Sequence, residues 1–94
     1  SISEIERIEK EWAEIGKATV GKIKAQAEAK GVQASAVTIH SDMIAEAIIA
    51  SAKKHECDLI VMASHGRRGI TRLLLGSETT HVLTHSDIPV MVLR

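Results

Sequence analysis

Aromatic residues are almost absent from this sequence: Trp12 is the single tryptophan, and phenylalanine and tyrosine do not occur. Base stacking on aromatic side chains, which most proteins that bind single-stranded nucleic acid use, is therefore unavailable. An excess of charge is also lacking, because 12 Lys and Arg balance 12 Asp and Glu. No overall electrostatic field attracts nucleic acid or a membrane surface, so we expect a local binding site and no partner of either kind.

Cysteine, proline and long apolar runs are equally scarce. The single Cys57 cannot form a disulfide within the chain, which is typical of a reducing compartment. No stretch approaches the roughly 20 apolar residues that a membrane-spanning helix needs. We therefore predict a soluble cytoplasmic protein whose 94 residues form one small domain, residues 1–94. Because the sequence begins at Ser1 and not at a methionine, we also expect it to be a fragment or a trimmed product.

Apolar residues recur at alternating steps of three and four over residues 4–30, which predicts a long amphipathic helix. Their stripe consists of Ile5, Ile8, Trp12, Ile15, Thr19 and Ile23. We expect Ser3 and Glu6 to form a capping box at the start of the helix and Gly31 to end it. The stripe is predicted to pack on the protein's own sheet, and a coiled-coil seam between two chains is the alternative.

The middle of the chain is predicted to hold two strands with a helix between them. Residues 34–39 have the pattern of a modest strand, and residues 43–56 that of a helix capped by Asp42. The apolar run over residues 59–63 does not alternate with polar residues, which indicates a central strand covered on both faces. Cys57 precedes this run and is expected to be a small buried residue.

The C-terminal part continues the alternation of helices and strands. After a short helical turn at residues 70–75, Ser77 is predicted to cap a helix that ends near His85. Residues 90–93 form the last strand, and Pro89 stands at its start, where a missing N–H is tolerated. Alternating helices and strands of this kind are typical of a parallel α/β layer fold.

The segment after the predicted central strand has features of a phosphate-binding loop. Gly66 and Gly76 allow the main chain to approach a ligand, and Ser77 begins a helix whose first N–H groups lack helical partners. The spacing matches neither the P-loop pattern GxxxxGK[ST] nor the dinucleotide pattern GxGxxG. Spacing alone therefore leaves a structural interpretation open, in which the glycines turn the chain and Ser77 only caps a helix.

A metal site receives weaker support from the sequence. His81 and His85 lie four residues apart on one predicted helix, with Glu78 one turn earlier. Metal sites need three or four convergent ligands, and helical histidine pairs are usually solvated. We therefore predict no metal-ligating residues.

The residues from Cys57 to Arg94, CDLIVMASHGRRGITRLLLGSETTHVLTHSDIPVMVLR, resemble the C-terminal half of the universal stress protein family. Nucleotide-binding members carry GxxG, nine residues, then G and S or T. Gly66, Gly76 and Ser77 match this pattern, whereas Ala63 replaces the first glycine. The resemblance implies a three-layer α/β fold with a parallel sheet, of the flavodoxin-like kind found in adenine nucleotide alpha hydrolases.

The resemblance also implies a ligand, ATP or AMP, with or without magnesium. Met62 and Ala63 would lie beside the nucleoside, the next four residues around the ribose and phosphates, and residues 76–79 at the phosphate tail. The implied site residues are Met62, Ala63, Ser64, His65, Gly66, Arg67, Gly76, Ser77, Glu78 and Thr79. No general base is recognisable among them, so we name no catalytic residue and expect at most very slow ATP hydrolysis.

The resemblance further implies a homodimer through the last strand, Pro89 to Leu93, other protein partners of unknown identity, and a role in stress tolerance. An interaction module of the same fold that dimerises without a nucleotide is the alternative. Family members begin with a strand ending in Asp, a helix and a second strand, and residues 1–30 resemble none of these. The missing strands would lie between the predicted strands 34–39 and 59–63, so we expect the N-terminal β-α-β unit to be absent.

Overall fold

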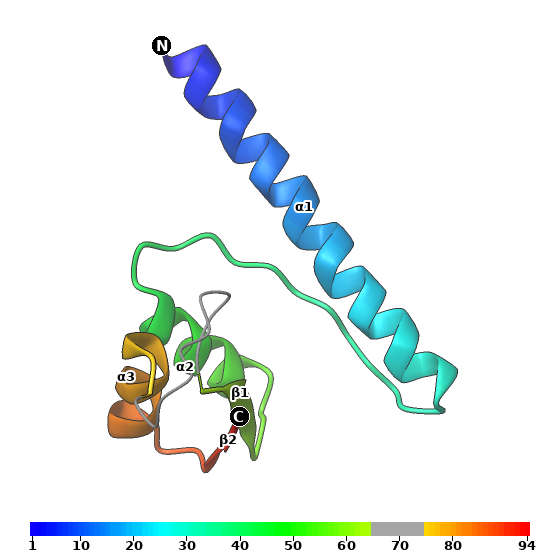
Figure 1. Ribbon diagram of the computed structural model, residues 1–94, viewed down its shortest axis with the longest axis vertical. Helices are drawn as coiled ribbons and strands as arrows, with labels where there is room; N and C mark the ends of the chain where they lie inside the picture. Colours follow the sequence, from blue (N-terminus) through cyan, green and yellow to red (C-terminus); the bar gives the residue numbers. More distant parts are fainter. Residues whose placement is uncertain (65–74) are drawn as a thin grey trace. The chain divides into compact units, whose positions relative to one another are not determined.

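The computed structural model describes residues 1–64 and 75–94 (Figure 1). These residues fall into two compact units, residues 1–40 and residues 41–94. The first unit holds one long helix and an extended segment, and the second holds two helices and two parallel strands.

Helix α1, Ile2–Ala29, begins with a capping box at Ser1. The Ser1 hydroxyl accepts from the Glu4 N–H at 3.3 Å, and the Ser1 amino group donates to the Glu4 carboxylate at 3.2 Å. The predicted capping pair, Ser3 and Glu6, is therefore wrong by two residues. Both pairs satisfy the same spacing of Ser and Glu, and the earlier pair extends the helix by half a turn.

Gly31 ends helix α1, as predicted. Its φ of 79° lies in the left-handed region. The N–H of Gly31 donates to the Glu28 carbonyl and the N–H of Val32 donates to the Ala27 carbonyl, both at 3.0 Å. These two bonds make a Schellman motif, which satisfies carbonyl groups that the helix leaves unpaired.

Residues 34–39 do not form the predicted strand. The chain there is extended but pairs with no strand among the residues that the structure describes. A strand is defined by its partner, and the sequence pattern carries no information on whether the partner is present. Instead, the segment lies alongside α1, where a Cβ on Gly16 would meet the Thr38 methyl group at 3.5 Å.

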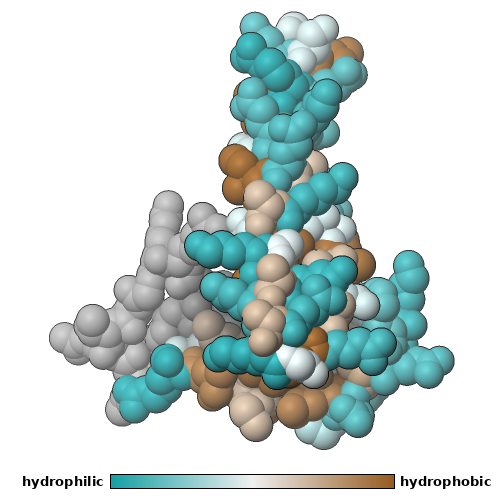
Figure 2. Space-filling view, turned by 90° about the vertical axis from the view of Figure 1, so that its right-hand side faces the viewer, coloured by the Kyte–Doolittle hydropathy of each residue, from teal (hydrophilic) through white to brown (hydrophobic). Residues whose placement is uncertain are grey.

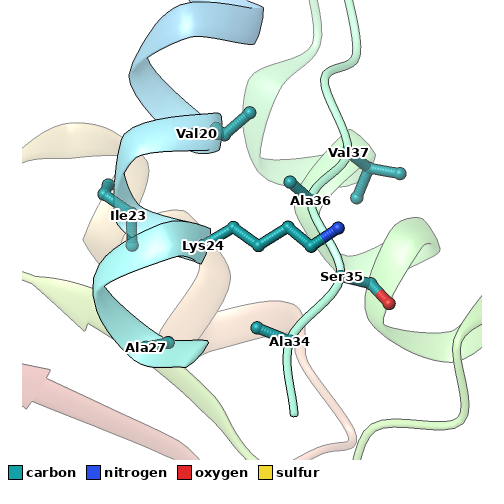
Figure 3. A pocket seen from close by; sticks show the side chains of 8 residues that line it. All are labelled: Val20, Ile23, Lys24, Ala27, Ala34, Ser35, Ala36 and Val37. Carbon is teal, nitrogen blue, oxygen red and sulfur yellow. The ribbon is translucent and has the colours of Figure 1, made fainter. Parts of the chain in front are cut away.

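A pocket of about 280 Å³ lies between α1 and this segment (Figure 3). Lys24 extends from the helix across it toward the segment. The lining is otherwise mainly small and apolar, with Val20, Ile23, Ala27, Ala34, Ser35, Ala36 and Val37. The extended segment thus packs on α1 through side chains.

Helix α2, Ile44–Lys54, has no side-chain cap at its first residue. The prediction that Asp42 caps this helix is wrong. Instead, the hydroxyl of Ser41 accepts a hydrogen bond from the N–H of Met43 at 3.0 Å. At the other end Glu56 adopts a positive φ of 54°. Cys57, predicted to be buried, is exposed because it follows directly on this surface turn.

Strands β1, Ile60–Ala63, and β2, Val90–Leu93, pair in parallel. The register places Ile60 opposite Val90 and Ala63 opposite Leu93. Helix α3, Ser77–His85, lies between them in the chain and packs against α2. Strand β1 was predicted to be covered on both faces, but Val61 is 54% exposed, so the helices cover only one face among the described residues.

The hydrophobic core of the second unit is small. Its buried apolar members are Ala45, Ala52, Ile60 and Val82, with Ile48, Ile49, Met62, Ile88 and Val90 packed against them. An isolated two-stranded sheet is at best marginally stable in water, so the packing of α2 and α3 is what stabilises the strands. Among the described residues, no helix is both long enough and apolar enough to span a bilayer.

Candidate functional site

The end of β1 and the start of α3 meet at one point in the second unit. The Gly76 N–H donates to the Ser64 carbonyl at 2.7 Å, and the Thr79 hydroxyl donates to the Ala63 carbonyl at 2.9 Å. These bonds join residues on either side of positions 65–74. The two anchors of the predicted phosphate-binding loop are therefore adjacent.

The strand side of this junction is fixed by the sheet. The Ser64 N–H donates to the Leu93 carbonyl at 2.7 Å, one residue beyond the last paired position of β1. Ser64 and Thr79 are buried, at 9% and 4% exposure. The Thr79 hydroxyl thus satisfies a strand carbonyl at a place that water reaches poorly.

The helix side of the junction presents unpaired N–H groups. Gly76 is the N-cap of α3 with an extended conformation, φ −62° and ψ 155°, and no side chain caps the helix. Ser77, predicted to be the cap, is instead the first helical residue. The first bond of the helix runs from the Thr80 N–H to the Gly76 carbonyl at 3.0 Å. The N–H groups of residues 77–79 have no helical acceptor and carry the positive end of the helix dipole.

The structure brings five of the ten predicted site residues together. Ala63, Ser64, Gly76, Ser77 and Thr79 all lie at the junction, whereas His65, Gly66 and Arg67 lie outside the described residues.

Two further predicted residues lie in the same strand and helix. The side chain of Met62 packs against the hydrophobic core, and Glu78 is exposed in the first turn of α3. Thr79 was predicted to lie at the phosphate tail, and its hydroxyl bond to the Ala63 carbonyl was not predicted. A hydroxyl residue in the first turn of a helix after a buried strand is the signal that marks it.

A histidine cluster lies on the neighbouring face of α2 and α3. His81 Nε2 is 3.0 Å from a carboxylate oxygen of Glu46, and the His81 and His85 rings are 4.4 Å apart. His85 Nδ1 lies 3.0 Å from the His81 carbonyl, to which it donates. In the part of the chain that the structure describes, no three His, Cys, Asp or Glu side chains converge to hold a metal ion.

Parallel strands joined through a helix, with the strand end bonded to the helix start, define an α/β domain with a strand–loop–helix site. The model of the universal stress protein family matches residues 2–94. The chain belongs to this family, and the match includes helix α1. The resemblance seen in the sequence is confirmed.

Similar proteins support the same assignment. Universal stress protein MJ0531 of Methanocaldococcus jannaschii is 36% identical over 85 residues, which are 86% of this chain and 47% of that protein. Universal stress protein Slr1230 of Synechocystis is 39% identical over 49 residues, which are 52% of this chain and 17% of that protein. The chain thus spans about half the length of the first of these relatives.

A solved structure confirms the α/β fold. It is that of hypothetical protein MJ0577, determined as a test of assigning biochemical function from structure. The TM-score is 0.86 at 28% identity, and the match covers 98% of this chain and 64% of that one.

Proposed function

We propose that this protein binds the phosphate groups of an adenine nucleotide, ATP or AMP, where β1 meets α3. The observation that carries the proposal is the pair of hydrogen bonds from Gly76 and Thr79 to the end of β1. They hold the start of α3 beside the end of the strand, and the first N–H groups of a helix, which lack helical acceptors, are suited to binding an anion. The family resemblance supplies the adenine part of the proposal.

The chemistry of this junction suits an anion held mainly by the main chain. Three successive N–H groups of α3 lack helical acceptors, and the helix dipole favours negative charge beside them. Glu78 opposes this, because its exposed carboxylate adds a negative charge in the same turn. A magnesium ion bound with the phosphates would offset that repulsion, and we expect the nucleotide to bind more tightly with it.

The sharpest test removes one N–H group without disturbing the helix. In Ser77→Pro the proline stands at the first helical position, which it favours, and Gly76 already has the extended conformation that precedes proline. We expect the affinity for ATP, measured by isothermal titration, to fall about tenfold, since a hydrogen bond to a charged group contributes roughly 1.5–3 kcal/mol. The melting temperature without ligand should not fall.

Ser77→Ala is the matched control, because it removes the hydroxyl and keeps the N–H. Its affinity for ATP should stay close to that of the unchanged protein. Equal affinity in Ser77→Pro, or no heat with either ATP or AMP, contradicts the proposed site.

A second candidate function is self-association through β2, with no nucleotide required. Its support is that β2 pairs only with β1 among the described residues, which leaves its other edge without a partner there. The Pro89 and Leu93 carbonyls accept hydrogen bonds from the side of β1. Because successive residues of a strand direct their main-chain N–H and C=O groups to opposite edges, the Val92 N–H points toward the other edge. An edge of this kind pairs readily with a second strand.

Val92→Pro tests this candidate by removing that N–H, and Val92→Ala is the control that keeps it. In sedimentation velocity we expect Val92→Pro to be monomeric and Val92→Ala to remain associated. Identical sedimentation of the two variants argues against pairing through β2. For a protein that associates without a nucleotide, we propose that such association within the cytoplasm is its role in stress tolerance.

A further inference from the structure

The apolar stripe of α1 lies open on the surface of the first unit. We define the α1 stripe as Ile5, Ile8, Trp12, Ile15 and Ile23, which are 38–61% exposed. Figure 2 shows apolar side chains standing among hydrophilic ones along this helix. Large apolar side chains repeated along one helix face are typical of a surface that packs against another helix.

The extended segment of the same unit leaves most of this stripe uncovered, because Ile23 is the one stripe residue that lines the pocket beside that segment, and it is still 59% exposed. The residues of α1 that are half-buried are Gly16, Val20, Lys24 and Ala27, which recur every three or four positions on a neighbouring face. This second face contacts residues 34–38, and its side chains line the pocket of Figure 3. Within the first unit, the α1 stripe therefore remains largely uncovered.

The charges of α1 differ between its two halves. Residues 2–15 hold five Glu against one Arg and one Lys, a net charge of −3. Residues 16–30 hold four Lys against one Glu, a net charge of +3. A helix of 28 residues is about 42 Å long, several times the screening length of about 8 Å at physiological salt, so the two halves act as separate charged regions.

We propose that α1 pairs through this stripe with α1 of a second copy of the chain, in antiparallel orientation. Antiparallel pairing places the acidic half of each helix beside the basic half of the other, whereas parallel pairing places like charges together along the whole length. Antiparallel pairing also sets the two helix dipoles in opposite directions, which is favourable. The steps of three, four and three from Ile5 to Ile15 are those of a coiled-coil seam, and Thr19 and Ile23 continue the same face at steps of four.

The antiparallel arrangement makes a definite prediction about which residues meet. Trp12 and Ile15 lie near the middle of the helix, close to the two-fold axis that relates the copies. Ile5 of one copy then lies near Ile23 of the other, and never near Ile5 of the other copy. Parallel pairing gives the opposite result.

Cysteine cross-linking distinguishes the two orientations. In a Cys57→Ser background, we make Ile5→Cys and Ile23→Cys as separate proteins and oxidise them with copper phenanthroline. We expect a covalent dimer when the two are mixed and little when either is oxidised alone. Cross-linking of each alone but not of the mixture overturns the antiparallel orientation. Repeating the mixture with Val92→Pro in both partners excludes association through β2 as the cause.

A second measurement does not depend on cysteine. Trp12 is the single aromatic residue of the three fluorescent types, so its emission reports on the α1 stripe. We expect the emission to move to shorter wavelength as protein concentration rises, in step with dimer formation in sedimentation equilibrium. Replacing Lys17, Lys22 and Lys24 with Glu should weaken association at least tenfold, and added salt should reduce that difference.

Two results would overturn the proposal on this measurement. One is a monomer at every concentration with Trp12 emission that stays at long wavelength. The other is short-wavelength emission that does not change with concentration, because the stripe is then covered within a single chain.

Discussion

Helices α1 and α2 end with the same hydrogen-bonding pattern, but different residues occupy the left-handed position. Helix α2 ends with bonds from the Glu56 N–H to the Lys53 carbonyl at 3.1 Å and from the Cys57 N–H to the Ala52 carbonyl at 2.9 Å. This is the Schellman pattern that also ends α1, where Gly31 holds the left-handed position. At Glu56 a Cβ occupies that conformation, which is costly for residues other than glycine.

Glu56→Gly should therefore stabilise the protein. We expect the free energy of unfolding, measured by urea denaturation, to rise by about 1 kcal/mol as the left-handed conformation is relieved. Gly31→Ala is the matched change in the opposite direction and should lower the free energy of unfolding by a similar amount. A loss of stability in Glu56→Gly is the result that this explanation does not allow.

Among the contacts between helices and strands, the junction between β1 and α3 is the one on which the proposed site depends. It joins a strand end to a helix start through one main-chain bond and one hydroxyl bond. The acceptor of the hydroxyl bond is a strand carbonyl near buried Ser64 and Thr79. If the hydroxyl is removed, this carbonyl loses its hydrogen bond at a place where water solvates it poorly.

Thr79→Val keeps the shape of the side chain and removes the hydroxyl. We expect the free energy of unfolding to fall by about 1–3 kcal/mol, the usual cost of leaving a buried carbonyl without its partner. Thr84→Val is the control, since its hydroxyl bonds the Thr80 carbonyl on an exposed face. Equal losses in the two variants contradict a special role for Thr79, and the measurement is urea denaturation.

The helices were predicted from sequence better than the strands, for a physical reason. The apolar period of α1, its end at Gly31 and the end of α3 at His85 depend on neighbours within a few residues. The strand at residues 34–39 depends on pairing with a strand far away in the sequence, which a local pattern does not specify, and it was predicted wrongly. The last strand, residues 90–93, was placed correctly.

The place where β1 meets α3 could be predicted from the sequence, but its contacts could not. Gly76 and the family pattern indicated where the strand meets the helix. The bond from Thr79 to the Ala63 carbonyl and the position of Ser77 inside the helix depend on how the two elements pack. Packing of this kind is set by residues far apart in the sequence, so a local pattern does not specify it.

The whole molecule combines zero net charge with many exposed apolar side chains. Equal numbers of acidic and basic residues give an isoelectric point near 6.9. Exposed residues such as Trp12, Val61 and Met91 lie in both units. Without a net charge, repulsion between copies is weak, so apolar contacts between molecules are favoured near neutral pH.

Solubility should therefore be lowest close to pH 7 and rise on both sides. Static light scattering from pH 5 to pH 9 measures this as a maximum of scattered intensity near the isoelectric point of about 6.9. Lys30→Glu removes a positive charge and adds a negative one, which lowers the net charge by two and should move the maximum to lower pH. A maximum that stays in place after this change indicates that net charge does not control association.

The closed junction of β1 and α3 has a consequence for how this site can evolve. The two bonds described for it join the main chain of Ser64 to that of Gly76 and the Thr79 hydroxyl to the Ala63 carbonyl, and these four residues all lie outside positions 65–74. Substitutions between these anchors thus leave the attachment points in place. Under the proposed function, ligand preference can then change, or be lost, while the surrounding domain keeps its fold.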